Sequence, residues 1–117
     1  MPRSATHRRN GRHTPAFVLL FLNEGPAHGA HLFARMKAEM PRCFSDSAGL
    51  YRALQSLERE GSVKATWEAQ RSGAPRKVYE ITRKGRAALR AFAEDIRDRE
   101  ANFRFFLVRL GSSSEEA

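Results

Sequence analysis

An unbroken apolar run near the start of the chain constrains its fold more than any other feature. Residues 16–22 read Ala-Phe-Val-Leu-Leu-Phe-Leu, and the preceding Thr14-Pro15 is typical of a helix cap and first turn. A helix without a polar face must be buried on several sides, so we predict a central helix over 15–22. The run is too short to cross a bilayer, and no small-residue cleavage site follows it. Neither a transmembrane segment nor a secretory signal is therefore expected.

Two further apolar stripes with helical spacing lie on either side of Pro41. They predict one helix over 29–40 and another that begins at a Ser45 or Asp46 cap and ends at Gly61. The residues that these helices bury are Leu32, Phe33, Met36 and Met40 in the first, and Leu50, Leu54 and Leu57 in the second.

Strand-like alternation follows over residues 63–68 and 76–81, on either side of a Gly/Pro-containing turn. Two such runs predict a β-hairpin. Its tip carries three cations, Arg71, Arg76 and Lys77. The alternation puts Trp67 on the same face as Val63 and Ala65, so we expect Trp67 to be packed in the core.

The last predicted element is a long helix that Thr82 caps, that runs to about Leu110 and that Gly111 and the following serines close. At ~1.5 Å per residue it would be a rod of about 40 Å. Its coiled-coil-like seam consists of Leu89, Phe92, Ile96, Phe103, Phe106 and Leu110. A small domain cannot cover this seam. We therefore predict a homodimer in which the seam packs against the partner's first helix through Phe17 and Phe21.

The positive charge of the chain is localised. Lys and Arg number 21 against 13 Asp and Glu, a net charge of +8. Residues 1–13 hold four Arg and no acid, and residues 63–86 hold seven bases against two acids. Such an excess is the footprint expected for a polyanion, either nucleic acid or an anionic membrane surface.

The order helix, helix, short turn, helix, basic hairpin, long helix is that of a winged helix-turn-helix, a mainly α (α+β) fold. In this fold the third helix enters the DNA major groove and the hairpin, or wing, lies against flanking phosphates. The side chains expected at DNA are Ser47, Tyr51, Arg52 and Gln55 on the helix and Arg71, Arg76 and Lys77 on the wing. The alternatives are that Tyr51 belongs to the core and that the charged and amide side chains are merely solvated.

Three stretches carry more specific motifs: residues 51–61 (YRALQSLEREG), His28-Gly29, and residues 73–85 (GAPRKVYEITRKG). They resemble, in turn, the recognition-helix motif, the second-helix start and the wing of the PadR family of bacterial transcriptional regulators. The resemblance covers residues 14–110, and the single C-terminal helix is similar to that of the small subfamily. The apolar first helix and the aromatic last helix are similar to those of members labelled polyhydroxybutyrate-responsive repressors.

The resemblance implies a repressor-type regulator that binds a pseudo-palindromic double-stranded DNA operator as a homodimer and that a small apolar effector releases. Three positions depart from the family pattern. Arg52 stands where Pro is usual, Ala30 where an aromatic residue is frequent, and Ala74 where the wing usually has Arg. The operator preference therefore does not carry over, and Arg71 is the candidate to replace the missing wing cation.

The implied domains are a disordered basic arm over 1–13, a DNA-binding domain over 14–82, a dimerisation helix over 83–110 and a flexible tail over 111–117. The aromatic residues Phe17, Phe21, Phe103 and Phe106 either are plain core or line an effector pocket. An alternative function is a module that uses the aromatic last helix to bind another protein, a polymer granule or a membrane surface.

Catalytic and metal chemistry are not expected. No nucleophile with a base and an orienting group stands out, and no Gly-rich phosphate loop follows a strand, so we predict no enzyme and no cofactor. A metal site at His28, His31 and Cys43 has three ligands and no fourth, and is disfavoured. The single cysteine excludes an intramolecular disulfide, which fits a reducing cytoplasm.

Overall fold

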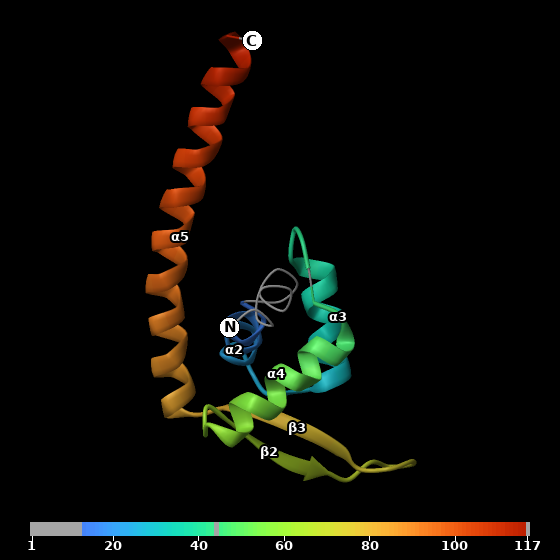
Figure 1. Ribbon diagram of the computed structural model, residues 1–117. Helices are drawn as coiled ribbons and strands as arrows, with labels where there is room; N and C mark the ends of the chain where they lie inside the picture. The colour runs from blue at the N-terminus through green and yellow to red at the C-terminus, as the bar shows by residue number, and fades with distance from the viewer. Residues whose placement is uncertain (1–12, 44, 117) are drawn as a thin grey trace.

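The computed structural model describes residues 13–43 and 45–116 of the chain (Figure 1). Its elements are α2 (Thr14–Leu22), β1 (Ala27–His28), α3 (Gly29–Glu39), α4 (Ser47–Arg59), β2 (Val63–Glu68), β3 (Arg76–Ile81) and α5 (Arg83–Glu116). The helices and the hairpin follow the predicted order, and β1 is an addition to it. The basic arm predicted over 1–13 lies, apart from His13, outside the described residues.

Helix α2 lies at the centre of the core, as its apolar sequence predicts. Its buried residues are Thr14, Ala16, Val18, Leu19, Phe21 and Leu22. The helix packs against α3, α4, α5 and β3, and Figure 1 shows these elements arranged around it. A helix enclosed on so many sides tolerates no polar face, which explains the sequence of the run.

Thr14 does not cap α2, contrary to the prediction. The helix already includes Thr14, and His13 takes the N-cap position without a side-chain hydrogen bond. The Thr14 hydroxyl turns inward instead and forms a hydrogen bond with the hydroxyl of Ser45, just before α4. A buried hydroxyl needs a partner, and this contact ties the start of α2 to the segment that leads into α4.

Helix α4 has the two end signals that the sequence predicts. The Asp46 side chain accepts a hydrogen bond of 2.8 Å from the backbone N–H of Gly49, which identifies Asp46 as the cap. At the other end Gly61 has φ +81°, and the N–H groups of Ser62 and Gly61 donate to the carbonyls of Leu57 and Glu58. This pair of bonds is a Schellman motif, in which glycine is favoured because it adopts the left-handed conformation without strain.

The sheet contains three antiparallel strands in the order β1-β3-β2. The hairpin pairs Val63 with Ile81 at its base and Glu68 with Arg76 at its far end. Strand β1 consists of two residues, Ala27 and His28, which pair with Tyr79 and Val78. The prediction missed β1 because so short a strand has no periodicity and exists only through its pairing with β3.

Trp67 is not in the core, contrary to the prediction. Val63 is buried and Ala65 is half-buried, but Trp67 is 69% exposed. The alternation correctly put the three residues on one face of β2. The core ends, however, before the hairpin does, so the last residue of the three lies beyond it.

Helix α5 is longer than predicted and stands partly clear of the domain (Figure 1). The Thr82 side chain accepts a hydrogen bond of 3.0 Å from the N–H of Gly85, as expected of a cap. The helix then continues through Gly111 to Glu116 instead of ending at Leu110. Gly111 is not among the glycines with positive φ in the described chain, so it does not act as the predicted helix stop. The flexible tail predicted over 111–117 is thus helical up to Glu116, the last described residue.

These elements form a winged helix-turn-helix with a long C-terminal helix, which confirms the predicted fold class. The helix-turn-helix consists of α3 and α4, and the wing is the hairpin of β2 and β3. The molecule measures 64 × 30 × 27 Å, and Figure 1 shows that α5 accounts for the long dimension.

Candidate nucleic-acid interface

One side of α4 is exposed and polar. Leu50, Ala53, Leu54 and Leu57 are buried and fix the orientation of the helix. The four predicted DNA-contacting residues of α4 are all exposed, and they are Ser47, Tyr51, Arg52 and Gln55. Three of them are spaced by four residues, so they share one face of the helix. The structure therefore leaves this face open to a partner.

Tyr51 has a defined position on that face. Its side chain is 41% exposed, and its ring lies over Gly29, the first residue of α3. A Cβ atom at position 29 would be 2.5 Å from Cε1 of Tyr51. Gly29 is therefore required for close approach of the ring, and Tyr51 belongs neither to the buried core nor to the freely solvated surface.

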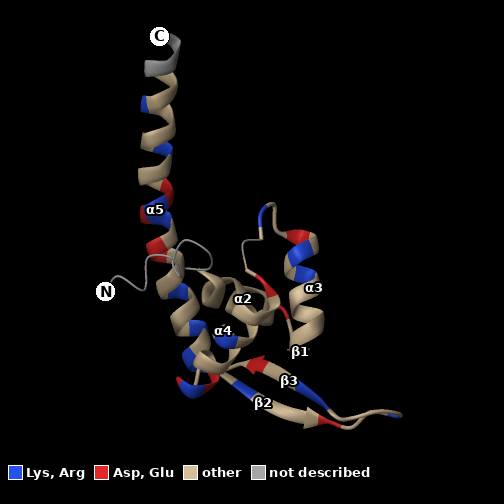
Figure 2. Cartoon of the chain, turned by 45° about the vertical axis from the view of Figure 1, so that its right-hand side comes forward, with Lys and Arg blue, Asp and Glu red and all other residues tan. Residues whose placement is uncertain are grey.

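The cations of the hairpin lie in its distal half. Arg71 is in the turn, and Arg76 and Lys77 begin β3, on the side of the molecule away from α5 (Figure 2). The turn includes Gly73, whose φ of +89° suits glycine. The remaining excess of basic residues in this segment is at the start of α5, which opens with Arg83 and Lys84. The charge of residues 63–86 thus forms two separate groups.

His28 connects the wing to α3. His28 takes the N-cap position of α3, with Nδ1 3.3 Å from the backbone nitrogen of His31. Its Nε2 lies 2.9 Å from Nη1 of Arg76. Both neighbours are donors and a neutral imidazole has one acceptor nitrogen, so His28 accepts from one of the two at a time. Desolvation and the positive charge of Arg76 both lower the pKa of His28 below its ordinary value. His28 was predicted only as a helix-start residue, and its contact with the wing has no local sequence signal.

The two halves of the candidate interface therefore meet at consecutive residues. Tyr51 of α4 lies on Gly29, and Arg76 of the wing contacts His28. His28 and Gly29 thus connect a side chain of α4 with a side chain of the wing.

Lys77 is the wing cation with an acidic partner. Its Nζ lies 3.2 Å from Oε1 of Glu58 on α4. The hydrogen bond with this carboxylate raises the pKa of Lys77. Among the described residues, neither Arg71 nor Arg76 takes part in an ion pair. The sequence carries no local signal for the role of Glu58, because this role depends on how α4 packs on the sheet.

The far half of α5 is an exposed apolar surface. Phe103 and Phe106 are 63% and 60% exposed, and Phe105, Leu107, Val108 and Leu110 are exposed as well. Leu89 and Phe92, nearer the start of the helix, pack on the core of their own chain, and Ile96 is half-buried. The predicted seam thus runs from the domain core onto a part of the helix that its own chain does not cover.

Phe17 and Phe21 are the two first-helix residues assigned to the dimer interface, and they differ in how much of their side chains is exposed to solvent. Phe17 is half-buried, whereas Phe21 is 6% exposed and belongs to the core of its own chain. The guanidinium of Arg35 covers the Phe21 ring at 4.9 Å from its centroid. Phe21 therefore has little surface left for contact with a partner chain.

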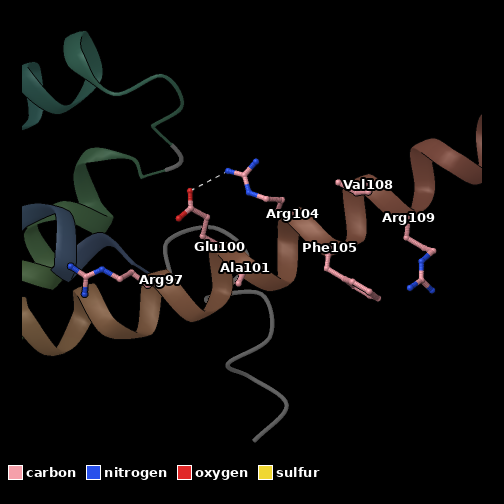
Figure 3. Close-up of a pocket in the computed structure, with 7 residues that line it drawn as sticks. All are labelled: Arg97, Glu100, Ala101, Arg104, Phe105, Val108 and Arg109. Carbon is pink, nitrogen blue, oxygen red and sulfur yellow. Dashed lines mark ion pairs between the residues drawn. The ribbon is translucent and has the colours of Figure 1, made fainter.

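A groove of about 440 Å³ lies between the start of α2 and α5. Its apolar lining comes from Phe17, Ile96, Phe103, Leu107 and Val108. A second hollow lies on α5 alone, where Arg97, Arg104, Arg109 and Phe105 project from the helix and Glu100 pairs with Arg104 at 3.7 Å (Figure 3). Because a single helix forms the second hollow, it is a shallow depression, whereas the first has walls from two elements.

Neither a metal-ligand cluster nor a membrane-spanning helix occurs in the described part of the chain. No cluster of three or more His, Cys, Asp or Glu side chains there is arranged to hold a metal ion. Cys43 is half-buried, with Sγ 3.8 Å from the carbonyl oxygen of Ser45. None of the described helices has the length and apolarity to span a membrane.

Comparison with protein-family models gives one match. Residues 18–91 match the family described as transcriptional regulator PadR-like. No curated protein sequence matches the chain.

Solved structures similar to this chain share its winged-helix fold. A conserved protein of unknown function, described as a potential transcriptional factor, is 27% identical with a TM-score of 0.74, over 91% of this chain and 94% of that one. A PadR family transcription regulator from hypervirulent Clostridium difficile is 19% identical with a TM-score of 0.70, over 81% of this chain and 98% of that one. PadR of Bacillus subtilis in complex with operator DNA is 21% identical with a TM-score of 0.62, over 68% of this chain and 44% of that one.

Proposed function

Because the chain belongs to the PadR-like family of transcriptional regulators, we propose that it is a repressor that binds a pseudo-palindromic operator as a homodimer. In this proposal α4 enters the major groove with Ser47, Tyr51, Arg52 and Gln55. The wing lies on the flanking phosphates with Arg71, Arg76 and Lys77. The role requires no catalytic group and puts the protein in the cytoplasm, with the DNA.

One observation carries the DNA-binding part of the proposal: Tyr51 and Arg76 rest on the consecutive residues Gly29 and His28. An aromatic hydroxyl from the helix and a guanidinium from the wing are thereby each held against the start of α3, and among the described residues neither has an acidic partner. Side chains of these types are among those that form hydrogen bonds with the DNA backbone. The operator complex of Bacillus subtilis PadR supports the same use of the fold here.

The exposed far half of α5 supports the proposed homodimer. Phe103, Phe106, Leu107 and Leu110 are exposed along one face of it, and a monomer rarely exposes so continuous an apolar surface. Pairing of this surface with the same surface of a second copy, and with Phe17, would bury it. Such a dimer would hold two copies of α4 about one DNA turn apart, roughly 34–36 Å.

The groove between α2 and α5 is the proposed effector site. It adjoins the dimer surface through Phe17 and Phe103 and is lined mainly by apolar side chains. A small apolar ligand that binds one arrangement of the two subunits better than the other would shift the dimer away from its DNA-binding form.

The exposed aromatic helix also favours a second candidate function, docking to another protein or to a granule or membrane surface. The two functions predict different binding. A surface-binding module would bind its target without any preference among DNA sequences, and its binding would survive the loss of the wing cations.

A selection from random duplex DNA followed by fluorescence anisotropy tests the proposal. The repressor predicts an enriched sequence that binds about a thousandfold or more tighter than a scrambled duplex of the same composition. Binding to both duplexes should weaken steeply as salt increases, because phosphate contacts release counterions. Failure to enrich any sequence, with equal binding to both duplexes, would contradict the proposal.

A further inference from the structure

The exposed indole of Trp67 has no role in the fold. It is the only tryptophan of the chain, and it is 69% exposed near the far end of β2. The other exposed large apolar side chains of the described residues are Leu20 on α2, Tyr51 on α4 and the group on α5. Trp67 is therefore the one exposed large apolar side chain of the described hairpin, well away from the proposed dimer surface.

The strand register fixes the side of the hairpin on which the indole lies. Trp67 pairs directly with Lys77, so the two side chains share one face of the hairpin. Lys77 reaches Glu58 of α4, and Tyr79, two residues further along β3, is buried on that same face. The Trp67 side chain thus lies on the face of the wing that turns toward α4, beyond the end of the core.

Two cations of the wing lie near Trp67. Lys77, directly opposite, shares its face and pairs with Glu58, and Arg71 is in the adjoining turn. Arg76 lies on the other face of the hairpin. DNA that entered beside α4 and under the wing would pass this face. A flat apolar ring with a cation beside it complements the sugar–phosphate backbone, which offers apolar deoxyribose faces between anionic groups. The indole N–H is also a donor suited to a phosphate oxygen.

We propose that Trp67 packs against the deoxyribose-phosphate backbone of the bound DNA, an inference that rests on the DNA-binding function proposed above. The contact reads no base. It adds the same favourable contribution to every DNA sequence, and it neutralises no phosphate, so it does not alter the number of counterions released on binding.

The fluorescence of the full-length protein tests the contact directly, because no other tryptophan contributes. Saturation with the selected duplex should change the intensity of the Trp67 emission and reduce its quenching by acrylamide. The scrambled duplex at saturating concentration should have the same effect. Emission and acrylamide quenching that stay unchanged while anisotropy reports full binding would overturn the inference and leave the DNA-binding function intact.

Variants give the second test. Trp67→Thr keeps a strand-forming residue but removes the ring, and Trp67→Phe keeps a smaller ring. Trp67→Thr should weaken binding about five- to tenfold for both duplexes, the lower range for an aromatic contact to nucleic acid, with an unchanged slope of log affinity against log salt. Trp67→Phe should lie between this variant and the wild type. Thr66→Ala is the matched control, because Thr66 neighbours Trp67 on the opposite face of β2.

The possible results distinguish the Trp67 contact from the DNA-binding function itself. Equal affinity of Trp67→Thr and the wild type would overturn the Trp67 contact alone. A change in the salt slope, or a loss confined to the selected duplex, would contradict the proposed backbone contact. If the wild type binds neither duplex, the DNA-binding function fails and the Trp67 contact fails with it.

Discussion

The ring of Tyr51 occupies the space that any side chain at position 29 would need. The distance of 2.5 Å between a Cβ at Gly29 and Cε1 of Tyr51 is shorter than carbon atoms tolerate. The absence of a side chain at Gly29 leaves room for the ring. Tyr51 therefore packs against the start of α3, while 41% of its side chain remains exposed. This contact joins the two helices of the helix-turn-helix at the residue that we assign to DNA.

Gly29→Ala should therefore impair DNA binding more than stability. The added methyl group displaces the Tyr51 ring toward solvent, and we expect operator affinity to fall about five- to tenfold. The free energy of unfolding should change by less than about 1 kcal/mol, because alanine favours the helix by up to that amount and the exposed ring can rotate away. Anisotropy and urea denaturation measure the two effects.

Gly111→Ala is the matched control for this variant. Gly111 also lies in a helix, but nothing within 4 Å would meet its Cβ atom. DNA affinity should not change. An equal loss of affinity in the two alanine variants would contradict the role given to Gly29.

Glu58→Gln should strengthen DNA binding. The Glu58 carboxylate holds Lys77 at 3.2 Å and competes with phosphate for its charge. Removal of that charge should raise affinity about two- to fivefold, the size of an exposed ion pair, and steepen the salt dependence. Glu80→Gln removes the same charge from the pair with Lys64, nearer the base of the hairpin, and should have a smaller effect. Equal gains for both variants would indicate a general charge effect instead.

The protonation of His28 should make the free energy of unfolding depend on pH. Its native pKa is lower than the ordinary 6.5, so below about pH 6.5 the unfolded chain takes up a proton more readily than the folded one. The free energy of unfolding should therefore fall as the pH decreases from 6.5 toward the native pKa of His28, and this dependence should level off below it. Urea denaturation between pH 5 and 8 should show a weaker dependence for His28→Gln. The same dependence in both proteins would exclude His28 as its source.

The dimer should depend on one face of α5. Phe103→Glu places a charge on the apolar seam, and we expect light scattering to report a monomer. Phe105→Glu is the control, because two residues at about 100° each put Phe105 on the opposite face. Both residues are exposed, so neither change should unfold the domain. A dimer that survives Phe103→Glu, or that Phe105→Glu breaks equally, would contradict the proposed seam.

The parts of the fold that sequence predicted are those with local signals. The residue types at positions 46 and 61 are enough to predict the Asp46 cap and the Gly61 helix end. Helix α2 follows from its own unbroken apolar run. Gly111 shows the limit of such signals. Glycine permits a helix to end, but it does not force an end where the backbone keeps its helical conformation.

The arrangement of the candidate site depended on packing that sequence did not reveal. His28 and Arg76 are 48 positions apart, and their contact exists because β1 pairs with β3. Alternation correctly assigned the face of Trp67 but carried no information on where the core ends. Residue types therefore led to the side chains that we assign to DNA, whereas the neighbours of these side chains became visible only in three dimensions.

A hydroxyl-radical footprint of the full-length protein on its selected duplex shows how the dimer is arranged on DNA. The proposed arrangement presents two copies of α4 and two wings to one side of the DNA. It predicts two protected regions with centres about 10–10.5 base pairs apart, related by the pseudo-symmetry of the sequence. A single protected region with one protein chain per duplex, or no protection above that of scrambled DNA, would contradict it.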